Sequence, residues 1–145
     1  MPKWASYKRL KRIADKYSIP RRWLFDIGGN TITFSTVRKL ATMLLLRELG
    51  APTRTVSFAR NDVVLSPAAI SAITGGLVNA SWCYYNQLLS MPLWRWRMRL
   101  RRFPLKGKRD AVLSALAEFG RKIEDLAQEM WNELCQANKT LKERR

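Results

Sequence analysis

Residues 109–139 read RDAVLSALAEFGRKIEDLAQEMWNELCQANK. From Val112 to Met130 the large apolar side chains recur at alternating intervals of four and three residues, which predicts one long amphipathic helix with a heptad-like seam. The seam consists of Val112, Leu116, Phe119, Ile123, Leu126, Met130 and Leu134. Such a seam can dock on the rest of its own chain, or it can join two copies into a homodimer through residues 109–137. The spacing leaves both alternatives open.

Charge divides the chain at the start of this helix. The 145 residues include 27 Lys and Arg but only 11 Asp and Glu, a net charge of +16. Residues 109–145 hold seven of each sign, so the whole excess lies in residues 1–108. We interpret residues 1–108 as a basic body and residues 109–145 as a charge-balanced helix, in the same domain or serving as a dimerisation element. So large an excess of one sign favours a polyanionic partner.

Residues 93–103, LWRWRMRLRRF, alternate between apolar residues and arginine. Alternation with period two predicts a β-strand over residues 93–102 with two unlike faces. Four arginines would then lie about 7 Å apart on one face, close to the spacing of successive phosphates along a nucleic-acid strand. The arginines expected to grip phosphate are Arg95, Arg97, Arg99 and Arg101, with Arg102 beside them.

The remaining patterns predict a mainly helical α+β fold with a single domain. Helices are expected over residues 7–17, 21–27, 36–49, 68–73 and 77–89, with Ser35 capping the third and Ser66 the fourth. A small antiparallel sheet is expected from residues 31–34, 54–59, 63–65 and 93–101. In the hairpin of residues 54–59 and 63–65, polar and apolar residues alternate only in the first strand, whereas the second is the apolar run Val63-Val64-Leu65.

The first two helices also carry a local motif. Ala14, Ser18, Ile19, Leu24 and Ile27 follow one another at spacings that resemble the helix-turn-helix of DNA-binding proteins, over residues 10–27 only. The resemblance implies that Arg21 and Arg22 face the DNA groove at the start of the second helix. Ser18 stands where glycine is usual, and Trp23, Phe25 and Asp26 depart from the pattern. A plain helical hairpin with a basic outer face is the alternative. The basic residues expected to form a second phosphate patch are Lys8, Arg9, Lys11, Arg12, Arg21 and Arg22.

Catalytic and metal-binding patterns are missing from the sequence. It has no histidine, the commonest general base and metal ligand, and its two cysteines have no metal-site spacing. We therefore expect no enzyme activity, no catalytic residues, no cofactor and no metal. No apolar run predicts a transmembrane segment or a secretion signal, and the expected location is cytoplasmic, or nuclear in a eukaryote.

These observations predict a non-enzymatic nucleic-acid-binding protein with DNA or RNA as its partner, and a dimeric DNA-binding regulator or accessory factor is one form that it could take. The first alternative is a protein-interaction module or inhibitor that captures an acidic partner protein through its basic surface and the seam. The second is a peripheral protein of anionic membranes, in which Trp and Met enter the lipid interface. A period of two counts against the second alternative, because interfacial segments are amphipathic helices.

Overall fold

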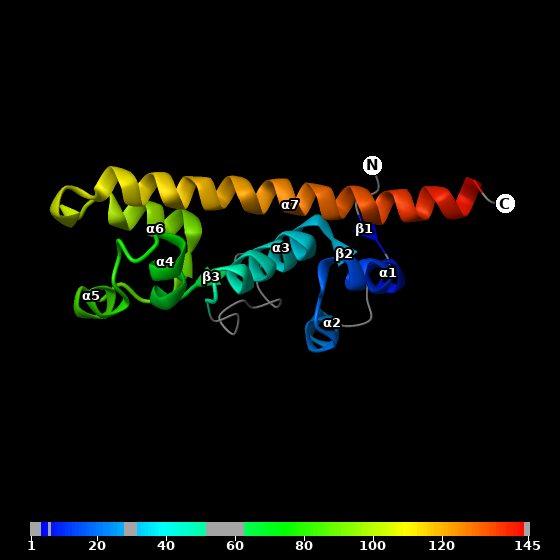
Figure 1. Ribbon diagram of the computed structural model, residues 1–145, viewed down its shortest axis with the longest axis horizontal. Helices are drawn as coiled ribbons and strands as arrows, with labels where there is room; N and C mark the ends of the chain where they lie inside the picture. Colours follow the sequence, from blue (N-terminus) through cyan, green and yellow to red (C-terminus); the bar gives the residue numbers. More distant parts are fainter. Residues whose placement is uncertain (1–3, 6, 28–31, 52–62, 144–145) are drawn as a thin grey trace.

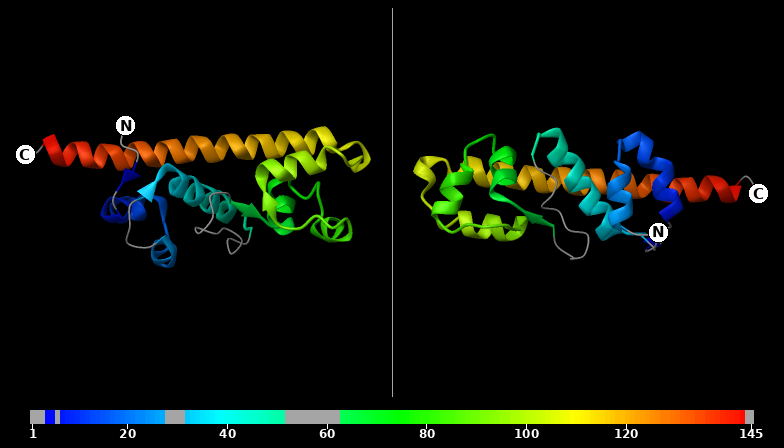
Figure 2. Two further views of the ribbon diagram at one scale, coloured as in Figure 1. Left: turned by 180° about the vertical axis from the view of Figure 1, so that it is seen from behind. Right: turned by 90° about the horizontal axis from the view of Figure 1, so that it is seen from below.

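Helix α7 (Arg109–Glu143) is the longest element, at 35 residues. In the computed structural model, which describes residues 4–5, 7–27, 32–51 and 63–143, every other helix lies on one side of α7 (Figures 1 and 2). Helices α1 (Tyr7–Tyr17) and α2 (Arg21–Ile27) lie toward its C-terminal end. Helix α3 (Phe34–Glu48) packs along its middle, and α4 (Pro67–Ile73), α5 (Ala80–Tyr85) and α6 (Leu93–Leu100) gather toward its N-terminal end.

The fold is mainly helical α+β, as the sequence predicts, with a minor antiparallel component. Strand β1 (Trp4–Ala5) pairs with β2 (Ile32–Thr33), and β3 (Val64–Leu65) pairs with β4 (Met91–Pro92). The prediction of a single sheet is therefore wrong, since these are two separate two-stranded ribbons. Its expected strand at 54–59 lies outside the described residues.

The ends of several helices follow from local chemistry. Helix α1 begins and ends at the predicted residues, and the Ser66 side chain accepts a hydrogen bond from the Ala69 amide at the start of α4, as predicted. Helix α3 begins two residues early, because Thr33 rather than Ser35 supplies its cap. The helix expected over residues 77–89 is confined to α5, which Asn79 caps.

The strand predicted over residues 93–102 is wrong, because this segment forms helix α6. Its alternating pattern also contains a helical stripe, in which Leu93, Trp96 and Leu100 recur at three and four residues. No residue of α6 is β-branched, and Leu, Met and Arg are good helix formers. The stripe faces the core: Trp96 and Leu100 are fully buried, and the Trp96 Nε1–H donates to the Leu65 carbonyl at 2.9 Å.

The seam of α7 docks on the body of its own chain, one of the two alternatives left open by the sequence. Helix α7 packs on α3, α1, α4 and α6. Six of the seven seam residues are buried, and Leu126 is half-buried against the same core. Two ion pairs cross the same boundary, Lys16 with Glu133 and Arg38 with Glu124. A homodimer formed through this seam would first have to separate α7 from the body.

Candidate nucleic-acid interface

The basic residues of α1 and α2 gather at one end of the molecule. We call them the N-terminal patch: Lys8, Arg9, Lys11, Arg12, Arg21 and Arg22. All are exposed except Arg9, which is half-buried. Helix α1 turns Leu10, Ile13 and Ala14 into the core, and this leaves its basic residues on the outer side. The six residues were predicted from the sequence to form one patch. They lie on α1 and α2, which are neighbours in the structure (Figure 1).

A tight turn fixes α1 against α2. Ser18 has a φ of 53°, the left-handed conformation for which glycine is usual, and the Ile19 amide donates to the Ala14 carbonyl at 2.9 Å. Ile19 is buried, as the end of this kind of helix cap requires. From α3, Arg47 donates to the carbonyls of Tyr17 and Ser18 and lies over the Trp23 ring. The turn therefore holds Arg21 and Arg22 in a fixed relation to α1.

A shallow hollow opens between the two helices of this patch. Lys11, Arg21, Leu24 and Phe25 line it, and its volume is about 230 Å³. Phe25 is 78% exposed at the edge of this hollow. Leu24, in contrast, is buried and anchors α2. Two cations beside an exposed aromatic ring suit both phosphate contact and base stacking.

The arginines of α6 do not share one face, because a helix separates residues two apart. Arg95 and Arg99 lie one turn apart on the same side. Arg97 is half-buried and faces α7, where it lines a hollow with Ala117 and Gly120. The row of four arginines at 7 Å intervals predicted from the sequence is thus wrong. Trp94 and Met98, 54% and 51% exposed, lie one turn apart on the outer surface of the same helix.

A second basic patch surrounds the connection from α6 to α7. We call it the α6 patch: Arg95, Arg99, Arg101, Arg102, Lys106 and Lys108. All are exposed except Arg99, which is half-buried. The 3₁₀ turn of Leu105–Gly107 presents Lys106 at the tip, and residues 93–109 contain no acidic residue. Lys106 and Lys108 were not among the residues predicted to grip phosphate, although they lie only a few residues beyond the arginines.

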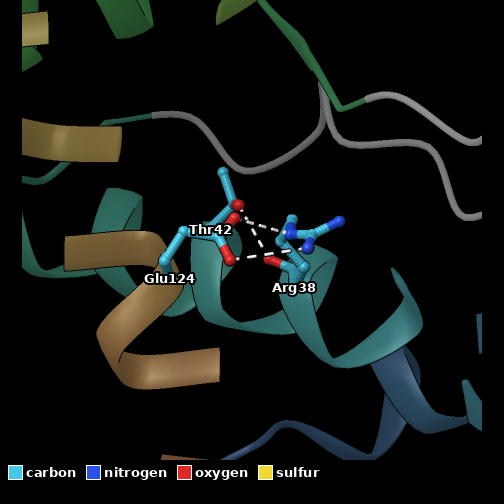
Figure 3. A network of polar contacts seen from close by, with 3 residues as sticks. All are labelled: Arg38, Thr42 and Glu124. Atoms are coloured by element: carbon cyan, nitrogen blue, oxygen red, sulfur yellow. Dashed lines mark hydrogen bonds and ion pairs between the residues drawn. The ribbon is translucent and has the colours of Figure 1, made fainter. Parts of the chain in front are cut away.

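A groove forms where α3, α6 and α7 meet, and no sequence pattern predicts it. It has a volume of about 270 Å³. Arg38 and Lys39 from α3, Arg97 from α6 and Glu124 from α7 supply its charges. Arg38 Nε lies 2.7 Å from Glu124 Oε1, and the Thr42 hydroxyl donates to the Arg38 carbonyl at 2.8 Å (Figure 3). The guanidinium also lies over the Phe34 ring, 5.0 Å from its centroid.

Acidic residues of α7 are partly engaged in ion pairs. Besides the two pairs that join it to the body, Glu118 pairs with Arg121 one turn away on α7 itself. The hydrogen bond and charge of Arg121 hold the pKa of this exposed carboxyl below its ordinary value. Three acidic residues of α7, Glu118, Glu124 and Glu133, are therefore engaged in ion pairs.

No family model, curated protein or solved structure matches the chain. Within the described ranges no helix is both long and apolar enough to cross a bilayer. In those same ranges, histidine, cysteine and acidic side chains do not gather in threes as a metal centre would need.

Proposed function

We propose that this protein binds nucleic acid without enzymatic activity, through the N-terminal patch and the α6 patch. The observation that carries the proposal is the exposure of both patches at opposite ends of a body that holds the entire net charge of +16. Each patch mixes arginine or lysine with an exposed aromatic residue, Phe25 in one and Trp94 beside the other. Arginine binds phosphate through planar, paired N–H groups, and aromatic rings stack on bases.

The separation of the patches favours a double-stranded target. The Lys16–Glu133 pair places α1 beside residue 133 of α7, whereas the α6 patch adjoins Arg109 at its beginning. Residues 109 and 133 of a helix lie about 36 Å apart along its axis at about 1.5 Å per residue. One turn of duplex DNA measures about 34–36 Å. A duplex lying along the molecule would therefore meet the two patches one turn apart.

The local helix-turn-helix is part of the same proposal. Its support is the turn at Ser18, together with the burial of Ala14, Ile19 and Leu24, which the motif requires for packing its two helices. Arg21 and Arg22 are exposed at the beginning of α2, where the motif places groove-facing residues. Trp23 is buried and stacks under Arg47, so it supports the turn instead of facing a groove.

The test is fluorescence anisotropy with a labelled duplex of roughly 20 base pairs and a single strand of equal length. If the patches contact six to ten phosphates, affinity should fall about 10³–10⁵-fold between about 50 and 200 mM salt. An α6-patch variant changes Arg95, Arg99, Arg101 and Arg102 to Gln, and should lower the slope of log affinity against log salt by up to about 3.6. The matched control changes Arg121 and Lys122 on α7 to Gln, and should leave the slope nearly unchanged.

Duplex length tests the two-patch arrangement separately. A duplex of roughly 8 base pairs is shorter than one turn and can reach only one patch. Neutralising the α6 patch should therefore weaken binding to the long duplex much more than binding to the short one. Affinity that stays nearly flat across the salt range, or that ignores the four substitutions, would refute nucleic-acid binding through these residues.

An anionic membrane surface is the second candidate, and the helical form of α6 favours it. Trp94 and Met98 are exposed on one turn, next to Arg95 and Arg99, which is how interfacial helices present apolar and basic residues. The objection that residues 93–102 have the period of a strand no longer applies. Co-sedimentation with phosphatidylserine vesicles, compared with phosphatidylcholine vesicles, distinguishes this candidate. Membrane binding predicts that the protein sediments with the phosphatidylserine vesicles only, and that Trp94→Ala abolishes this binding.

The acidic-partner alternative loses one of its two supports. It relied on the basic surface and on the seam of α7, but the seam is buried against α1, α3, α4 and α6. Trp94 remains exposed and could still anchor a protein contact. Purified protein that carries no nucleic acid, judged by its absorbance at 260 and 280 nm, and that ignores added duplex would favour this alternative.

A further inference from the structure

We propose that the groove between α3, α6 and α7 binds a 5′-phosphorylated nucleotide, either free or at the end of a strand. The groove lies between the two basic patches and is built from other residues, so it does not depend on them. Its charged lining comes from three helices that meet only in the folded chain. The duplex-binding surface does not require it.

The cationic side of the groove points to a phosphate. Arg97 is half-buried, and its helix packs against α7 at Gly120, which also lines the groove. Arg38 stands opposite on α3, held by Glu124. Lys39 is only 5% exposed and lines the same space. Arg38 and Arg97 thus outnumber the single carboxylate among the described lining residues, and a guanidinium group in a partly dehydrated site suits a phosphate monoester.

The apolar side of the groove points to a planar group next to that phosphate. Val63, Leu65, Pro92, Leu93 and Ile123 form its walls, and Trp94 stands half-exposed at its edge. An indole in that position can stack on a base, whatever the base is. The volume of about 270 Å³ lies just below the usual range for organic ligands, which suits a group the size of one nucleotide.

Helix α7 contributes Gly120, which has no side chain, to the lining of the groove. A Cβ on Gly120 would meet Leu93 Cδ2 at 3.5 Å, an ordinary contact, so helix packing does not demand glycine here. Glycine in a helix interior is unfavourable by about 1 kcal/mol relative to alanine. The groove benefits from it nonetheless, because Gly120 lines the groove and a large side chain at this position would reduce the space for a ligand.

Isothermal titration calorimetry with 5′-dAMP, adenosine and inorganic phosphate tests the proposal on the full chain. We expect 5′-dAMP to bind and the other two to bind at least about tenfold more weakly, since each retains only one of the two recognised parts. Arg97→Gln should weaken 5′-dAMP binding about tenfold or more, because it removes a charged hydrogen-bonding partner. Trp94→Leu should weaken it by about fivefold or more through lost stacking.

Two controls keep the result interpretable. Arg102→Gln removes an exposed charge of the α6 patch outside the groove, and should leave 5′-dAMP binding unchanged. Circular dichroism shows whether Arg97→Gln still folds, and Trp94→Leu changes an exposed side chain whose loss should not affect folding. Inorganic phosphate that binds as tightly as 5′-dAMP, or 5′-dAMP binding that survives both groove substitutions, would overturn the proposal.

Oligonucleotides distinguish the two sources of the nucleotide. A single strand with a 5′-phosphate should bind more tightly than its 5′-hydroxyl counterpart if the groove takes strand ends, and Arg97→Gln should abolish that difference. Equal binding of the two strands, together with 5′-dAMP binding that needs Arg97, would assign the groove to free nucleotides. Failure of both 5′-dAMP and the 5′-phosphate to bind in the groove refutes the inference, whatever the two basic patches do with duplex.

Discussion

Replacing Trp96 and Trp94 in turn tests the helical form of α6, on which both basic-surface arguments depend. Trp96 is fully buried, and its Nε1–H donates to the Leu65 carbonyl at 2.9 Å. Trp96→Phe leaves this buried carbonyl without that donor, at a cost of about 1–3 kcal/mol. The smaller ring also leaves a void larger than a methyl group, which costs about 1 kcal/mol more. We expect a total loss of about 2–4 kcal/mol in the free energy of unfolding.

Trp94→Phe is the matched control, two residues away on the same helix. Trp94 is 54% exposed, so its replacement should change the free energy of unfolding by no more than about 0.5 kcal/mol. Urea unfolding followed by circular dichroism measures both variants, and equal slopes against urea would show that the unfolded states are comparable. A strand would place the two tryptophans on one face. Similar losses in the two variants would therefore refute the helix.

Four further expectations concern glycines and thiols. Gly120→Ala should raise the free energy of unfolding by about 1 kcal/mol, because alanine favours the helix and its Cβ makes an ordinary contact with Leu93. Gly50→Ala should instead lower it by about 1 kcal/mol or more, since Gly50 has a φ of 71°; thermal unfolding of both variants should thus give shifts of opposite sign. Burial raises the pKa of the Cys83 thiol from 9.0 to about 11, so Ellman's reagent at pH 8 should label Cys135 well before Cys83. The unfolded chain releases this proton first, so the contribution of Cys83 is complete below pH 9.0 and should be lost as the pH rises toward about 11, a decline that Cys83→Ala should remove.

The helices with clear local signals could be predicted from the sequence. Helix α1 has one apolar face and stops at a left-handed residue, and α4 begins with a capping serine followed by proline. Helix α7 has a spacing that no strand could use. In each case the neighbouring residues determine the structure, so no knowledge of the tertiary contacts is needed.

Helix α6 could not be predicted, because its sequence satisfies two periods at once. Trp94 and Trp96 differ in burial only because α7 and β3 cover one side of a helix at this place. The groove was missed for a related reason. Arg38, Arg97 and Glu124 are far apart in the sequence and belong to no motif, so only the packing of three helices brings them together.

The exposed basic residues were predictable as a set, although their arrangement was not. Lys8, Arg12, Arg21 and Arg22 were expected on outer surfaces of two short helices and lie there. Arg97 was expected beside Arg95 and Arg99 but faces α7. The sequence shows which arginines and lysines are expected at the surface. The distances between them depend on whether residues 93–102 form a strand or a helix, and the alternating sequence fits both.

The docking of α1 on the far half of α7 has a consequence for the order in which the chain folds during synthesis. Helix α1 leaves the ribosome well before α7, and Glu133, the partner of Lys16, lies 117 residues later. Helices α6 and α7, joined by one short turn, can pair as soon as both have emerged. Helix α1 must therefore wait for its contact with α7, although it is made earlier. Chaperone contact during translation should concentrate on this early segment, and a stalled chain ending near residue 120 should expose it permanently.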